Sequence, residues 1–126
     1  MSINDKCPCG SGLKYKKCCK TYHDGRAAKT ALVLMKSRYS AYALNQAKYI
    51  LKTNCTDEDS LESIQEFSKN RIFQNLEILE FIDGEKEAFV TFRVKLLTNG
   101  KNNSFTEKSR FIKENDIWFY VDGEVS

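Results

Sequence analysis

The sequence predicts an α+β protein in which helices come first and antiparallel strands follow, with a small cysteine-rich segment before both. Up to about residue 70, apolar residues recur at three- and four-residue steps, which is typical of amphipathic helices; beyond it they alternate with polar residues, as in strands. Turn residues separate the alternating runs, at Asp83-Gly84, Asn99-Gly100 and Asn115-Asp116. We therefore expect one domain over residues 26–126 and a small separate unit over residues 1–25.

The small unit is defined by its cysteines. Four of the five cysteines lie in the stretch CPCGSGLKYKKCC, which begins at residue 7. Two thiolate pairs joined by a turn are what tetrahedral zinc requires, and the two glycines between them adopt positive φ without penalty. The stretch is too short to bury a core, so metal binding would supply its folding free energy. We predict a zinc knuckle with these ligands: Cys7, Cys9, Cys18 and Cys19.

Other interpretations of the same thiols stay open. Iron or an iron–sulfur cluster uses the same ligands, and two disulfides would form in an oxidising compartment. A redox switch, in which oxidation expels the metal, is compatible with a zinc resting state. His23 follows the last cysteine closely and is a candidate replacement for one thiolate, although a solvated surface histidine is the commoner case.

Three helices are expected before the strands. After a linker over residues 20–25, an apolar stripe predicts a long helix from about Arg26 to Ala43. Asn45-Gln46 indicates a bend, and residues 47–53 form a second, shorter helix. Ser60 is a plausible N-cap of a third helix, with Ser63 at the capping-box position, and this helix ends near Asn70.

The strands are expected over residues 76–82, 88–97, 105–113 and 117–121. In the second of these, one face is wholly apolar, which predicts that it packs against a helix. That face consists of Ala88, Val90, Phe92, Val94 and Leu96. Trp118 and Tyr120 share a face of the last strand and are interpreted as core residues.

Composition and charge narrow the setting. The sequence has no run of 18 apolar residues and no signal-peptide core near its start, so we expect a cytoplasmic protein without membrane association. The net charge of +3 is concentrated in residues 1–26, which hold six basic and two acidic side chains. We interpret these lysines mainly as compensation for an anionic metal centre, and alternatively as a surface for an acidic partner or a phosphate backbone.

Several blocks resemble a known family. The stretch CPCGSGLKYKKCC closely resembles the SEC-C motif, which is also found in the SecA translocation ATPase. Residues 34–42 resemble the signature helix of the YchJ family, and residues 109–112 and 118–123 look like its C-terminal strands. The resemblance implies a SEC-C motif followed by a nuclear-transport-factor-two-like domain, a cystatin-like cone in which a curved four-stranded sheet wraps a long helix. Family members tend to carry Trp-His-Pro near position 55, whereas this chain has Asn54-Cys55-Thr56, which removes a histidine.

A cone of this kind usually leaves a cavity between sheet and helix, which is a default ligand site. For Arg38 we favour a structural salt bridge with Glu77 or Glu80, and an anion-binding pocket is the alternative. Cys55 is more often a small buried hydrophobe than a second functional thiol, and strand alternation would also permit Arg110 to face solvent. The candidate pocket residues are Arg38, Tyr39, Tyr42, Cys55 and Arg110.

No catalytic motif is present, so the sequence favours a non-catalytic zinc protein. SEC-C modules resemble docking surfaces, which implies a protein or ribosomal partner met by Lys14, Lys16 and Lys17. The cone would act as a scaffold or bind a small molecule. The alternatives are an enzyme or carrier for a small anionic ligand, and a metal-delivery or redox-sensing protein. The sequence does not indicate an oligomeric state.

Overall fold

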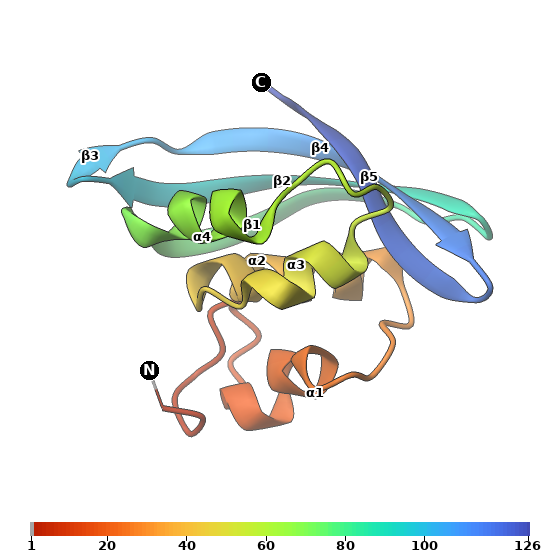
Figure 1. The fold of residues 1–126 in the computed structure, drawn as a ribbon, viewed down its shortest axis with the longest axis horizontal. Helices are drawn as coiled ribbons and strands as arrows, with labels where there is room; N and C mark the ends of the chain where they lie inside the picture. Colours follow the sequence, from red (N-terminus) through yellow and green to blue (C-terminus); the bar gives the residue numbers. More distant parts are fainter. Residues whose placement is uncertain (1) are drawn as a thin grey trace.

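Helix α2 (Ala31–Ala43) lies in the middle of the molecule, with the sheet on one side and the N-terminal segment on the other (Figure 1). This arrangement is seen in a computed structural model that describes residues 2–126. The Thr30 hydroxyl accepts a hydrogen bond from the Val33 amide at 3.1 Å and so caps the helix. The expected start at Arg26 is therefore wrong, because the cap places the first helical turn at Ala31.

The remaining helices are short. The expected linker after the cysteines is wrong in part, because a 3₁₀ turn (η1, Tyr15–Lys17) and helix α1 (Cys19–His23) occupy this region. Helix α3 (Ala47–Thr53) has the predicted bounds. Helix α4 (Leu61–Lys69) begins with the predicted capping box, in which Ser60 and Ser63 bond each other's backbone amides.

The sheet has the strand order β1-β2-β4-β5, and every pair along this path is antiparallel. The two-residue strand β3 adds to the end of β2, beside the Asn99-Gly100 turn, so the sheet has one strand more than expected. Strand β1 begins well before the predicted residue 76. The strands are β1 (Arg71–Ile82), β2 (Glu87–Thr98), β3 (Lys101–Asn102), β4 (Phe105–Glu114) and β5 (Ile117–Val125).

The sheet is irregular in register, and this irregularity bends it. Pairing shifts occur twice along β1, between Phe73 and Asn75 and between Ile78 and Glu80, and once between β4 and β5 beside Arg110. Such bulges bend a strand and increase its twist. Helix α2 contacts β1, β2 and β5, so the sheet wraps this helix, as the cone fold requires.

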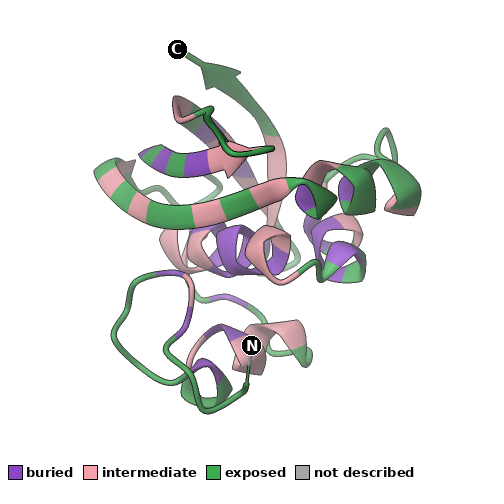
Figure 2. Ribbon diagram, turned by 90° about the vertical axis from the view of Figure 1, so that its left-hand side faces the viewer, coloured by how far each residue is buried: buried purple, intermediate pink, exposed green. Residues whose placement is uncertain are grey.

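The core fills the space between α2 and the sheet (Figure 2). The predicted apolar face of β2 is buried throughout, as are Leu34, Ile50 and Phe111. Helix α2 is also buried on the side facing the N-terminal segment, where Ser37 and Ser40 are fully inaccessible. This helix therefore buries a second face in addition to the expected apolar stripe. None of the helices within residues 2–126 combines the length and the apolar character needed to cross a bilayer.

Candidate metal centre and ligand pocket

The cysteine cluster, meaning Cys7, Cys9, Cys18 and Cys19, gathers four sulfur atoms within 4.8 Å of one another. The Cys9 and Cys18 sulfurs lie 3.6 Å apart. Zinc–sulfur bonds of about 2.3 Å in a tetrahedron would separate the sulfurs by about 3.8 Å, so the cluster has the dimensions of a four-thiolate metal site. Three of the four side chains are buried and Cys18 is half-buried.

The local backbone explains how the two cysteine pairs meet. The Cys7 amide donates to the Leu13 carbonyl at 2.8 Å, and the Gly10 amide donates to the Cys7 carbonyl at 3.2 Å. Gly10 and Gly12 have φ of +84° and +82°, a region that other residues adopt only with strain. The chain therefore folds back, and the junction between η1 and α1 presents the second pair to the first.

Hydroxyl groups surround the sulfurs. Ser40 Oγ lies 3.4 Å from Cys7 Sγ, and Ser11 Oγ lies 3.1 Å from Cys18 Sγ. A hydroxyl donates to a thiolate, so both serines stabilise the charged form that a metal needs. Ser40 belongs to α2, which means that the domain helix supplies part of the surroundings of the cluster.

The thiols perturb one another strongly. Hydrogen bonds from Cys19 and Cys9 lower the pKa of Cys7, and the corresponding bonds with Cys7 and Cys9 raise the pKa of Cys19. Four adjacent thiolates would repel one another, which favours protonated thiols unless a cation offsets the charge. A divalent cation would replace those protons and allow all four cysteines to act as thiolates. The donor set fits zinc, and iron uses the same ligands.

His23 is not a ligand of this cluster. Its Nδ1 accepts from the Tyr15 hydroxyl at 2.6 Å, and its Nε2 donates to the Ser37 carbonyl at 2.8 Å, so both ring nitrogens are occupied. The alternative in which His23 replaces a thiolate is therefore wrong, and so is the picture of a solvated surface histidine. The ring is half-buried and packs against Tyr49, with ring centroids 4.7 Å apart. His23 connects the N-terminal segment to α2.

The three lysines predicted to meet a partner are exposed around η1. Two apolar side chains of the same segment, which the sequence interpretation did not single out, are also exposed: Leu13 at 54% and Ile3 at 47%. A surface that combines cationic and apolar groups is suited to contact with another molecule. These five residues, Ile3, Leu13, Lys14, Lys16 and Lys17, are here named the knuckle surface.

A pocket of about 430 Å³ lies between α2 and the sheet, which is within the size range of small-molecule sites. Arg38, Tyr39 and Tyr42 line it, as the sequence predicted. Its remaining wall is mainly aromatic and aliphatic, with a few polar groups. The further lining residues are Met35, Phe67, Arg71, Phe73, Phe92, Val94, Asn103, Phe105, Glu107, Ser109, Phe111, Tyr120 and Val125.

Arg38 is 6% exposed and has no carboxylate partner among residues 2–126. Its Nη1 donates to the Ile50 carbonyl at 3.2 Å and to the Thr53 hydroxyl at 2.8 Å. The guanidinium lies over the Tyr120 ring, 4.3 Å from its centroid. The favoured salt bridge with Glu77 or Glu80 is wrong, because those two carboxylates are exposed on β1. Burial lowers the pKa of Arg38, which reflects the cost of a charge in this place.

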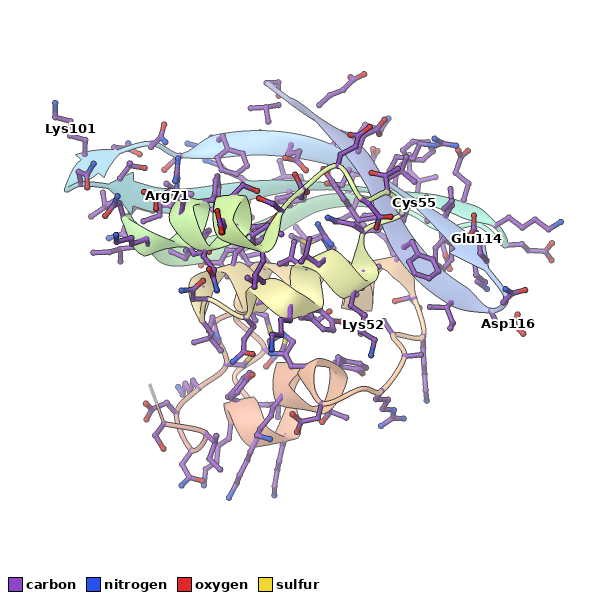
Figure 3. All side chains as sticks on the ribbon, in the orientation of Figure 1. Lys52, Cys55, Arg71, Lys101, Glu114 and Asp116 are labelled. Atoms are coloured by element: carbon purple, nitrogen blue, oxygen red, sulfur yellow. The ribbon has the colours of Figure 1, made fainter. Side chains whose placement is uncertain are left out.

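Two of the predicted pocket residues lie outside the pocket. Arg110 alternates with the buried Ser109 and Phe111, so its side chain points to the other face of β4, where it pairs with Glu87 at 2.6 Å. Cys55 is exposed in the connection between α3 and α4, beside β5 and far from Arg71 in Figure 3. It is therefore neither a pocket residue nor the buried hydrophobe that we favoured. Its backbone amide, rather than its thiol, contacts the sheet, through the Tyr120 carbonyl at 2.8 Å.

The sequence interpretation missed two polar groups on the inward face of β4. Glu107 and Ser109 line the pocket, and the Ser109 hydroxyl donates to Glu107 Oε2 at 2.5 Å. The sequence could have indicated them, because side chains alternate between the two faces of a strand. Glu107 and Ser109 are an even number of residues from the apolar Phe111 and therefore share its inward face. Arg110, which the sequence suggested as a pocket residue, lies on the opposite face of this strand.

Comparison with known families agrees with this architecture. Residues 30–123 match the family described as "YchJ, middle NTF2-like domain", and residues 4–20 match the SEC-C motif. A UPF0225 protein of Vibrio parahaemolyticus is 38% identical over 123 residues, which is 93% of this chain and 73% of the relative. A UPF0225 protein of an Enterobacter strain is also 38% identical over 123 residues, covering 93% of this chain and 81% of the relative.

Two solved structures have the same fold. The solution structure of a SEC-C motif containing protein from Rhodopseudomonas palustris has a TM-score of 0.87 at 30% identity and covers 94% of this chain and 96% of its own. The crystal structure of a SEC-C motif containing protein from Psychrobacter arcticus has a TM-score of 0.86 at 28% identity, covering 100% and 86%. The division at residue 25 stays a prediction. The extensive matches show that this chain belongs to the YchJ (UPF0225) family, with a SEC-C motif in front of an NTF2-like domain.

Proposed function

We propose that this protein is a non-catalytic, zinc-bearing cytoplasmic protein that binds a small organic anion with an apolar body in the pocket between α2 and the sheet. The observation that carries the proposal is the buried guanidinium of Arg38, which lies in the wall of a mainly apolar pocket and has no carboxylate partner within residues 2–126. The zinc site has a structural part in this proposal, because four protein ligands leave no open coordination position.

The argument rests on the cost of burying a charge. A guanidinium removed from water is costly unless charged or polar partners surround it, and a carboxylate is its best-matched partner. Arg38 has five N–H donors, and its hydrogen bonds within residues 2–126 all run from Nη1. Donors on Nε and Nη2 are thus available to an anion that enters the pocket, while the surrounding rings accommodate an apolar body.

The test uses 3-phenylpropionate as the probe, titrated into the metal-loaded protein by isothermal titration calorimetry. Arg38→Met is expected to abolish binding, since it removes the anion's partner. Arg110→Met, which removes an exposed arginine on the other face of the sheet, is the matched control and is expected to bind like the unaltered protein.

Two results would contradict the proposal. One is equal affinity of the Arg38→Met variant and the unaltered chain. The other needs no variant: NMR shift changes caused by the probe that map away from α2, β4 and β5. The second result keeps the proposal testable where Arg38→Met fails to fold.

A second candidate function is supported by the knuckle surface, whose lysines and apolar side chains are all exposed. We propose that it docks an anionic partner, with the ribosome as the partner to test. Reversing the charges of Lys14, Lys16 and Lys17 is expected to abolish co-sedimentation with ribosomes while metal content stays unchanged. The matched control reverses three exposed lysines of the helices: Lys48, Lys52 and Lys69. Equal loss in both variants would argue against a specific surface.

A further inference from the structure

The pocket contains a carboxylate as well as a cation. Glu107 on β4 lines the same cavity as Arg38, and it is half-buried. The ion pairs within residues 2–126 are Lys20–Asp24 and Arg110–Glu87, so Arg38 and Glu107 form no ion pair with each other or with another charged side chain of this part of the chain. Arg38 and Glu107 therefore share one cavity without neutralising each other by direct contact. The other cation of the lining, Arg71, donates to the Phe67 carbonyl at 2.6 Å and lies over the Phe67 ring.

The Glu107 carboxylate is held in place by its neighbours. Ser109, which is 1% exposed, donates its hydroxyl to Oε2 at 2.5 Å. On the adjacent strand β5, Gly123 leaves the space that this side chain fills, because a Cβ at that position would lie 2.6 Å from Glu107 Cδ. A surface carboxylate needs neither of these devices. Here they fix a charged group at the wall of the pocket.

The electrostatics agree that these groups lie within reach of one another. Burial lowers the pKa of Arg38, and Tyr42, Tyr120 and Glu107 act against that lowering. Burial also raises the pKa of Tyr42, so its phenol stays protonated and can donate or accept a hydrogen bond beside both charges. The polar end of the pocket thus has an anion receptor, a cation receptor and neutral hydroxyls.

We propose that the pocket binds a zwitterion of the α-amino-acid type with a large apolar or aromatic side chain. The ligand carboxylate pairs with Arg38, its ammonium pairs with Glu107, and its side chain lies among aromatic rings that include Phe73 and Phe92. This inference rests on the proposed function and makes it specific: an acid without the ammonium group would leave Glu107 without a cationic partner.

The experiment compares three probes on the unaltered, metal-loaded chain: L-phenylalanine, 3-phenylpropionate and 2-phenylethylamine. All three share the aromatic body. L-phenylalanine carries both charged groups, 3-phenylpropionate carries only the carboxylate, and 2-phenylethylamine carries only the ammonium. L-phenylalanine is expected to bind at least about tenfold more tightly than either of the other two, which is what a single charge-assisted hydrogen bond provides.

Glu107→Gln is expected to reduce the affinity for L-phenylalanine about tenfold, to the level of 3-phenylpropionate, whose own affinity stays the same or rises. Glu77→Gln, at an exposed carboxylate on β1, is the matched control and is expected to change neither affinity. A carboxylate that only stabilises the fold would instead change the affinities for both probes together.

The outcomes separate the two proposals. If 3-phenylpropionate binds as tightly as L-phenylalanine, the zwitterion inference is overturned and the proposed function stands. If neither of these two probes binds, both are overturned. The probe comparison needs no substitution, so it decides the matter even where Glu107→Gln fails to fold.

Discussion

At the scale of single residues, Arg38 keeps its charge in the interior through a carbonyl, a hydroxyl and a ring. Each of these contacts is weak beside a carboxylate, and the ring contact adds about 0.5–2 kcal/mol. Together they hold the guanidinium in a defined orientation over Tyr120. The residue is thus oriented in advance for a ligand, which lowers the entropy cost of binding.

Gly123 gives the sharpest residue-scale prediction. Gly123→Ala places a methyl group where the Glu107 side chain lies, and a flexible side chain is displaced more easily than the backbone. We expect the variant to fold and to lose affinity for L-phenylalanine as Glu107→Gln does, measured by calorimetry. The matched control is Gly100→Ala, which meets no atom within 4 Å of the added Cβ but has a strained φ of +81°. Reduced affinity in the control alone would argue against the account given for Gly123.

His23 predicts a pH dependence of stability. Burial lowers the pKa of His23 from its ordinary value of about 6.5. The unfolded chain therefore binds more protons than the folded one below about pH 6.5, so this group makes the free energy of unfolding fall as the pH drops through that window. The loss levels off below the folded-state pKa.

The measurement is urea unfolding of the unaltered chain and of His23→Gln at pH 7.5 and pH 5.5. The glutamine cannot titrate, so the stability advantage of the unaltered chain is expected to shrink at the lower pH. Protonation of the cysteine cluster affects both proteins and cancels in the comparison. If the stability advantage of the unaltered chain is the same at both pH values, His23 is not the source of the pH dependence.

At the scale of elements, helix α2 serves two sites with two faces. One face presents Ser37 and Ser40 to the N-terminal segment, and the other presents Arg38 and Tyr42 to the pocket. A chain of hydrogen bonds that passes through α3 also connects these two faces of α2. His23 contacts the Ser37 carbonyl, the Ser37 hydroxyl contacts the Tyr49 hydroxyl at 2.7 Å, and the Tyr49 carbonyl accepts from Thr53.

Thr53 completes this connection because its hydroxyl accepts from Arg38. Removing the metal with a chelator is therefore expected to do more than lower the melting temperature. It should also weaken 3-phenylpropionate binding, since the N-terminal segment would no longer hold Ser37 and its partners. Calorimetric titration before and after metal removal tests this, and restoring zinc should restore the affinity. Unchanged affinity in the metal-free protein would show that the two faces are independent.

At the scale of the whole molecule, the metal content tests the assignment of the N-terminal segment. Elemental analysis of protein purified without added metal is expected to find one zinc per chain, and Cys9→Ser with Cys18→Ser should abolish it. Cys55→Ser is the matched control, since this exposed cysteine lies outside the cluster and its loss should leave the metal in place. Iron in place of zinc would support the alternative metal, and no metal in the unaltered protein would refute the metal site.

The architecture was predictable to the extent that it depends on local pattern. The capping box at Ser60, the bounds of α3 and the buried face of β2 all follow from short-range chemistry in the sequence. The contact between Glu107 and Gly123 did not, because it needs the register between β4 and β5. The second buried face of α2 was missed because Ser37 and Ser40 look polar until the N-terminal segment covers them.

The cysteine cluster has a consequence for the order of events during synthesis. All its ligands lie between residues 7 and 19, so they leave the ribosome before any residue of the sheet has been made. Closing a loop this short takes on the order of 100 ns, whereas translation adds about 5–20 residues per second. A nascent chain can therefore acquire its metal seconds before β4 and β5 emerge. The metal centre would then form before the polar end of the pocket does.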